Sequence, residues 1–310
     1  MKRLQHSIKK TVVYKGNGLH SGIPVTLTMH PAAPGTGIIF RRIDLPNQPE
    51  VPAHINYVTN TLRATTLERN LAKVFTVEHI LSGLYALQID NCIIEMDSPE
   101  PPVGDGSSKV FVDLILEAGI ETQKEEIEVF ELPHSVSVYE EDKFIAALPY
   151  KGLRVTFTSV NPHPLLGTQV MDLEITSNSY IKEISSARTI GFTKEIETFS
   201  LNKYSAQKLF IDDICYARTI AFTEELEMMR KLGLGKGGTI ENVVVYDKDT
   251  CLSQLRSDDE LVRHKILDIL GDVSLVGPFN AHIIAVLGSH KLNADLSAKL
   301  IQLRNEYECK

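Results

Sequence analysis

The chain has 310 residues, of which 43% are hydrophobic, and its 32 basic and 40 acidic side chains give a net charge of −8. This length suits two domains of ordinary size, and the acidic balance argues against nucleic-acid binding as the main role. No apolar run is long enough to span a membrane, and the basic N-terminus lacks the apolar stretch of a secretory signal, so we expect a cytoplasmic protein without a transmembrane segment.

The first part of the chain is predicted to form strands around one helical unit. Alternating apolar residues over 11–32, broken by Gly-Asn-Gly and Ser-Gly, predict a hairpin. The next predicted elements are a strand over 37–43, a helix over 77–88, a strand over 91–97, a Pro- and Gly-rich loop over 98–108 and a helix over 109–118. Ser107 or Ser108 is the expected N-cap of that last helix.

A charged stretch over 121–132 marks a predicted domain boundary near residue 127. Beyond it the same order returns. The predicted strands are 135–141, 143–149, 153–159, 170–176, 241–247 and 281–289, and the predicted helices are 259–270 and 294–307. We therefore expect two domains of similar plan, 1–127 and 128–310.

Residues of metal-ligand type lie on two of these helices. Four residues advance a helix by about 400°, so His264, Asp268 and Asp272 share one stripe. A catalytic zinc commonly takes three protein ligands and leaves a position for water. His79 is the natural third ligand, and Glu78 beside it is the natural base.

A lone His-x3-Asp pair is more often a surface pair than a metal site. Here the surrounding residues are apolar, which predicts a buried helix whose polar side chains need partners or a metal. The four cysteines have no C-x2-C spacing, so any metal is held by nitrogen and oxygen. Such ligands suit Zn²⁺ and also Fe²⁺.

Three further features of the sequence are candidates for a binding site. The glycine-rich stretch 233–239 lacks the spacing of a triphosphate-binding loop and is followed by a strand, so we do not expect nucleoside triphosphate binding. His20 and His163 can each line a site or serve as a hydrogen-bonded turn histidine, and the sequence leaves both readings open.

Seven motifs in order resemble one known family. They are GNGLHSG, TVEHILSGL, EPPVGDGSSKVFVDLILEAGI, ARTIAF, GLGKGGTIENVVV, VRHKILDILGD and GSHKLN, and the resemblance runs from about residue 5 to residue 300. Together they resemble the UDP-3-O-acyl-N-acetylglucosamine deacetylases, zinc amidohydrolases that catalyse the committed step of lipid A synthesis.

The resemblance implies a role for each matching residue. It implies zinc ligation by His79, His264 and Asp268, with Glu78 as general base. His290 would be the general acid. The same motifs imply that Asp272 orients this histidine and that Lys265 approaches the substrate's diphosphate, with an acyl passage near Ile220, Phe222 and Gly238.

The resemblance also implies an α+β fold. Each domain would be a sheet with a pair of helices, and the helices of both domains would pack between the two sheets. The zinc would then lie at the domain junction, a common place for an active site. The implied partner is an acylated UDP-N-acetylglucosamine, and a monomer is expected.

The chain departs from the family pattern in one region. The stretch 179–197 recurs as 208–227, so Thr189 of one ARTI motif is repeated as Thr219. The family's threonine helps to hold the reacting carbonyl oxygen. We assign this role to Thr219, which keeps the family's separation from the VRHKILDILGD helix. Residues 179–207 would then form an added helix docked outside, and the alternative is that the first copy works.

Two rival functions remain at the level of sequence. A zinc hydrolase of the same fold acting on another acylated amine would use the same ligands. A noncatalytic scaffold is the second rival, in which the repeated segment has created a partner surface and spoiled the acyl passage.

Overall fold

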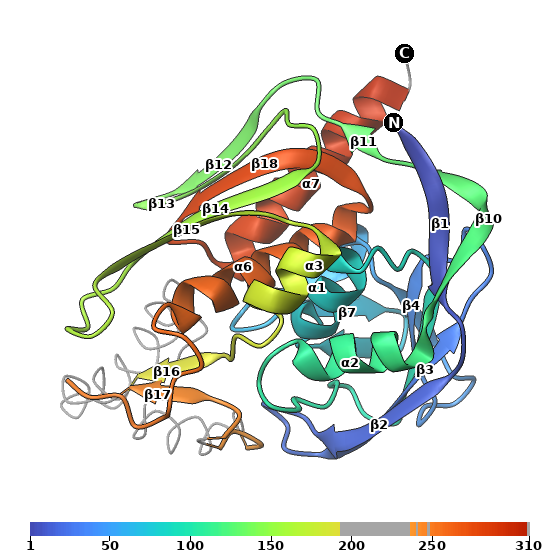
Figure 1. Cartoon of the computed structure of the whole chain (residues 1–310). Helices are drawn as coiled ribbons and strands as arrows, with labels where there is room; N and C mark the ends of the chain where they lie inside the picture. The colour runs from blue at the N-terminus through green and yellow to red at the C-terminus, as the bar shows by residue number, and fades with distance from the viewer. Residues whose placement is uncertain (193–235, 240, 247–248, 309–310) are drawn as a thin grey trace.

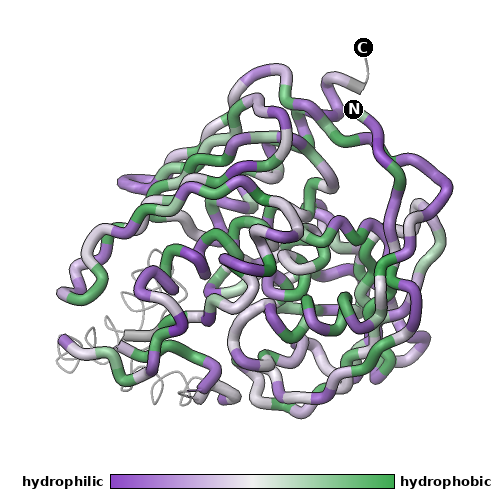
Figure 2. Tube along the Cα trace, viewed as in Figure 1, coloured by the Kyte–Doolittle hydropathy of each residue, from purple (hydrophilic) through white to green (hydrophobic). Residues whose placement is uncertain are grey.

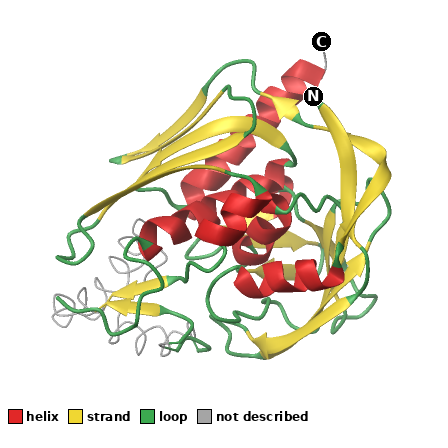
Figure 3. Ribbon diagram, in the orientation of Figure 1, coloured by secondary structure: helices red, strands yellow, loops and turns green. Residues whose placement is uncertain are grey.

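The computed structural model describes residues 1–192, 236–239, 241–246 and 249–308. Two β-sheets form its outer layers, and helices fill the space between them (Figures 1 and 3). The expected α+β architecture, with the helices of both halves packed between two sheets, is confirmed.

The first half contains the predicted hairpin. Its sheet has the order β2-β3-β9-β4-β5, in which β4 runs parallel to β9 and the other pairs are antiparallel. The strands are β2 (Val12–Asn17), β3 (Pro24–Pro31), β4 (Ile38–Arg42), β5 (Glu50–Pro52) and β9 (Cys92–Met96), and the helices are α1 (Glu78–Ala86) and α2 (Lys109–Ala118). A smaller sheet contains β6 (Val58–Asn60), β7 (Thr66–Arg69) and β8 (Ala72–Phe75), and the 3-10 turn η1 (Ile55–Tyr57) precedes it.

The second half repeats this plan with a larger sheet. Its strand order is β12-β13-β18-β14-β15, and β11 also pairs with β18. The strands are β11 (Phe130–Glu131), β12 (Val136–Glu140), β13 (Lys143–Leu148), β14 (Leu153–Val160), β15 (Thr168–Glu174) and β18 (Phe279–Val286), and the long helices are α6 (Glu260–Val273) and α7 (His290–Glu308). Helix α7 begins at His290, earlier than the predicted start near residue 294.

Short elements complete the second half. They are α3 (Ser177–Ser179), the π-helix η2 (Tyr180–Ile184), the 3-10 turn η3 (Ser274–Val276), and the parallel strands β16 (Ile190–Phe192) and β17 (Val244–Tyr246). Both β16 and β17 lie at one end of the molecule, away from the two termini (Figure 1).

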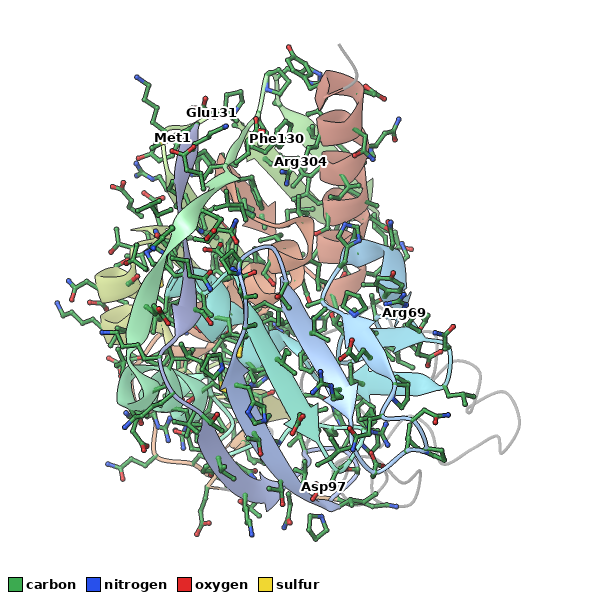
Figure 4. All side chains as sticks on the ribbon, turned by 90° about the vertical axis from the view of Figure 1, so that its right-hand side faces the viewer. Met1, Arg69, Asp97, Phe130, Glu131 and Arg304 are labelled. Carbon is green, nitrogen blue, oxygen red and sulfur yellow. The ribbon has the colours of Figure 1, made fainter. Side chains whose placement is uncertain are left out.

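A two-stranded antiparallel ribbon lies at the side of the molecule. It consists of β1 (Lys2–Ile8) and β10 (Ile120–Glu128), and its tube is largely hydrophilic in Figure 2. Met1 and Glu131 lie close together at the end of this ribbon in Figure 4, where the chain passes from β10 into β11 of the second sheet. This change of sheet supports our proposed boundary between domains 1–127 and 128–310.

Helices α1 and α6 pack against each other at the centre of the molecule. Their apolar residues include Ile80, Leu84 and Ile266, all almost completely buried. The helices approach so closely that a Cβ at Gly271 would lie 2.2 Å from the carbonyl oxygen of Glu78. This contact fixes the first turn of α1 against the polar stripe of α6.

Candidate metal centre

Three buried side chains from the two halves converge between α1 and α6. His79, in the first turn of α1, lies with His264 and Asp268 of α6, and each offers one ligand atom within 4.8 Å of the others. The apolar spacing of both helices buries their facing sides, and the i, i+4 spacing places His264 and Asp268 on the same stripe.

The orientation of His264 leaves one nitrogen for a ligand. Its Nδ1 donates to the carbonyl oxygen of Ala187 over 3.1 Å, so Nε2 carries the lone pair. Within the part of the chain that the structure describes, His264 Nε2 and Asp268 Oδ1 are buried without a hydrogen-bond partner. A cation between them satisfies both atoms, and two imidazoles with one carboxylate suit Zn²⁺ or Fe²⁺.

The protonation states also fit metal binding, which requires neutral imidazoles and an ionised carboxylate. Burial and the neighbouring His264 ring lower the pKa of His79 to about 3. Burial likewise lowers the pKa of His264. Burial alone would raise the pKa of Asp268, but nearby His264 and Lys265 outweigh it and hold that pKa well below its usual range.

Two serines before and at the start of α2 have different contacts. Ser108 is the N-cap residue of α2 but makes no side-chain capping bond, and Ser107 Oγ accepts from the backbone N–H of Lys109 over 3.1 Å. Ser108 Oγ instead donates to the carbonyl oxygen of His79 over 2.7 Å, and the ring of His79 bonds to the backbone of Ser107. Both serines therefore link α2 to a metal-ligand candidate.

Lys265 contacts the same ligand set. Its Nζ is buried and donates to Oδ2 of Asp268 over 2.7 Å. The other carboxylate oxygen of Asp268, Oδ1, then faces His264 Nε2 at a distance of 3.3 Å. Its predicted approach to a diphosphate stays a prediction.

Glu78 is buried beside the ligand candidates. Its Oε2 accepts from the backbone N–H of Thr65 over 3.1 Å, and Oε1 has no hydrogen-bond partner among the described residues. Burial raises the pKa of Glu78 to about 8, and the carboxylates of Asp272 and Asp268 add to the rise. A carboxylate with one anchored and one free oxygen is suited to accept a proton near neutral pH.

His290 faces Glu78 from the start of α7. Its Nε2 lies 3.9 Å from Oε1 of Glu78, and its Nδ1 donates to Oδ2 of Asp272 over 2.7 Å. Burial disfavours the imidazolium, but the charge and hydrogen bond of Asp272 outweigh it and raise the pKa of His290 to about 9. Asp272 is itself held by Thr65 Oγ1 at 2.5 Å and Asn293 Nδ2 at 2.8 Å.

Sequence reasoning missed Thr65 and Asn293. Thr65 lies in a polar stretch before β7 that matches no ligand or acid–base spacing. Asn293 is one turn after His290 on α7, so its proximity to that histidine follows once the helix is extended to residue 290.

Comparisons with known proteins identify the family of the chain. The model of the family described as UDP-3-O-acyl N-acetylglycosamine deacetylase matches residues 5–207 and 198–302. The chain belongs to this family. The deacetylase of Chlamydia caviae, named UDP-3-O-acyl-N-acetylglucosamine deacetylase, is 39% identical over 307 residues, which cover 98% of this chain and 99% of that protein.

A more distant bacterium gives a similar match. The Myxococcus xanthus protein with the same name is 37% identical over 307 residues, 98% of this chain and 88% of that protein. As a member of the UDP-3-O-acyl N-acetylglycosamine deacetylase family, the chain is an enzyme that hydrolyses an amide. None of the described helices is long and apolar enough to cross a membrane.

The two stretches matched by the deacetylase family model overlap within the repeated region. The described part of the first copy is built into the fold. Tyr180 is completely buried and its hydroxyl bonds Ser82 Oγ of α1 over 2.7 Å, while the backbone N–H of Thr189 donates to Gly106 O over 2.9 Å. The expectation of a helix docked outside is therefore wrong for the described start of the first copy, because Tyr180 and Ile184 belong to the main hydrophobic core and η2 packs against α6.

The second copy offers no such test, since Thr219, Ile220 and Phe222 lie outside the described residues. Gly238, the remaining residue expected along the acyl passage, is buried in the segment 236–239. That segment contacts the first half of the chain, because the N–H of Gly237 donates to the carbonyl oxygen of Leu19 over 3.0 Å.

The histidines left open by the sequence differ in setting. The backbone N–H of His20 donates to Glu100, and both of its ring nitrogens lack partners among the described residues. Burial is the main cause that lowers the pKa of His20, and the nearby His290 adds a smaller effect in the same direction. A role for His20 in lining the site stays a prediction. His163 is a turn histidine, since its Nδ1 accepts from the N–H of Leu165 over 3.2 Å.

Proposed function

We propose that the protein is a zinc-dependent deacetylase that hydrolyses the N-acetyl amide of UDP-3-O-acyl-N-acetylglucosamine in lipid A synthesis. One observation carries the proposal. The unpartnered atoms of His264 and Asp268 meet His79 next to a facing carboxylate and imidazole, Glu78 and His290. The names of the relatives supply the substrate.

Zinc held by His79, His264 and Asp268 would supply a Lewis acid at the scissile amide. The chain's own residues then handle the protons. Glu78, anchored through Oε2 by Thr65, takes the proton of the attacking water at Oε1. His290, whose imidazolium is stabilised by Asp272, donates a proton from Nε2 to the departing amine.

The contact to the developing oxyanion falls on Thr189 in this proposal, in place of Thr219. The N–H of Thr189 bonds Gly106 O, and its carbonyl accepts from Val244 N over 2.8 Å. Gly106 precedes Ser107, whose backbone holds the ring of His79. The first copy is thereby tied to the segment that positions a zinc ligand, which supports its use in the reaction.

Three further expectations, two about the substrate and one about the oligomeric state, continue as part of this proposal. Lys265 approaches the diphosphate, a passage near Gly238 receives the acyl chain, and the enzyme acts as a monomer. The bond from Lys265 Nζ to the proposed ligand Asp268 supports a position of Lys265 beside the metal site, and Gly238 is buried in a segment that is hydrogen-bonded to the first half of the chain.

The test combines metal analysis with acetate release from the acylated UDP-sugar. We expect one zinc per chain and acetate formation that stops in His264→Ala. Zinc-loaded protein without acetate release would support the scaffold alternative. Equal rates on N-acetylglucosamine lacking the nucleotide would support a hydrolase of another acylated amine.

A further inference from the structure

One peptide unit bridges two side chains of α6. The carbonyl oxygen of Ala187 accepts from Nδ1 of His264 over 3.1 Å, and the N–H of Arg188, in the same peptide unit, donates to Oε1 of Glu260 over 3.0 Å. Glu260 and His264 are four residues apart and so lie one above the other on the helix. The peptide therefore connects the Glu260 carboxylate to the His264 ring.

The Glu260 carboxylate is buried and fully hydrogen-bonded. Arg188 donates from Nε to Oε1 over 2.8 Å and from Nη2 to Oε2 over 3.1 Å, and the N–H of Arg256 donates to Oε2 over 2.8 Å. Arg188 Nη2 also donates to the carbonyl oxygen of Gln254 over 2.6 Å. Burial favours the neutral acid, but these donors outweigh it and hold the pKa of Glu260 below its usual value.

Histidine ligands of metals usually donate their second nitrogen to a carboxylate or a carbonyl, which fixes the tautomer and makes the ligand nitrogen more basic. Hydrogen bonds in series also polarise one another. Here the acceptor is a carbonyl whose own peptide N–H faces a buried anion. The negative charge of Glu260 strengthens that carbonyl as an acceptor and so strengthens Nε2 of His264 as a donor to the metal.

We propose that Glu260 is a positioning residue for the metal, acting on His264 through the 187–188 peptide, and that Arg188 holds its carboxylate in place. The inference rests on the metal site proposed above. Ala187-Arg188-Thr189 recurs as Ala217-Arg218-Thr219 in the second copy. Arg188 already forms the ion pair with Glu260, so the same substitution at Arg218, the matching arginine of the second copy, serves as a control.

The experiment measures the zinc dissociation constant of the full chain by competition with a coloured chelator. Glu260→Gln keeps the shape of the acceptor and removes its charge, and we expect zinc to bind about 10-fold more weakly, the lower end of the usual loss for such partners. Arg188→Lys should also weaken zinc binding. Arg218→Lys should bind zinc as the wild type does.

A second readout separates positioning from folding. Arg188→Leu combined with Glu260→Leu removes both buried charges, so the double variant retains a well-packed interior. We expect it to fold, by circular dichroism, yet to bind zinc more weakly and to alter the visible spectrum of the Co²⁺-loaded protein.

Three results would overturn the inference. They are wild-type zinc affinity in folded Glu260→Gln, wild-type affinity and Co²⁺ spectrum in the folded double variant, and a loss of affinity in Arg218→Lys without one in Arg188→Lys. Failure of the proposed function is distinguishable, because acetate release from the acylated UDP-sugar by the wild-type chain tests that function, whereas zinc affinity and the Co²⁺ spectrum of the variants test the inference.

Discussion

Replacement of Asp272 by Asn should move the whole pH–rate profile to lower pH. Asp272 is the main cause of the raised pKa of His290, which lies near 9 instead of 6.5. A shift of that size corresponds to about 3 kcal/mol in favour of the imidazolium. The general acid is present below this pKa and lost above it. Without the Asp272 charge the pKa of His290 falls, so the alkaline limb moves to lower pH.

The acid limb should move in the same direction. Asp272 also raises the pKa of Glu78, whose ionised form acts as base and is lost as the pH falls through that pKa. Removing the charge lowers the pKa of Glu78 and extends activity to lower pH. A bound cation lowers it in the zinc enzyme as well, so the comparison must be made between zinc-loaded proteins.

The assay is acetate release from the acylated UDP-sugar, followed as kcat/KM from about pH 5 to pH 10, the range that spans both limbs. Asp113→Asn, an exposed carboxylate of α2 paired with Lys109, is the matched control and should leave both limbs in place. An alkaline limb that stays at its wild-type pH in Asp272→Asn would refute the assignment of His290 as a general acid tuned by Asp272.

Five other substitutions test separate parts of the molecule. Asp268→Ala should lower bound zinc, measured by metal analysis, and full occupancy would remove it from the ligand set. Glu78→Gln should keep zinc but slow acetate release by about 10²-fold or more, the usual scale for a lost general base. Thr189→Ala should slow turnover by about ten-fold or more while Thr219→Ala has little effect; the reverse pattern would return the role to the second copy. Gly271→Ala should lower the melting temperature and the rate together, because its Cβ would meet the Glu78 carbonyl oxygen at 2.2 Å; an unchanged melting temperature would contradict this packing.

The helices that carry the ligand candidates follow from local sequence patterns. The apolar periodicity around residues 77–88 and 259–270 predicts two buried amphipathic helices, and helical spacing alone puts His264, Asp268 and Asp272 on one stripe. The strands of both halves were recognisable for the same reason, because alternation and turn residues are local properties. The order of the seven motifs, through the family that they resemble, implies the roles of the site residues.

Which polar groups contact one another depends on long-range packing. Thr65 and Asp272 are separated by 207 positions, and their hydrogen bond exists because Gly271 lets α6 approach the start of α1. No local pattern marks a backbone carbonyl such as that of Ala187 as the acceptor for His264. The repeated ARTI motif shows the same limit. Both copies contain the ARTI motif and so share its local preferences, whereas the burial of Thr189 and the bond of its N–H to Gly106 O are long-range contacts that no local pattern specifies.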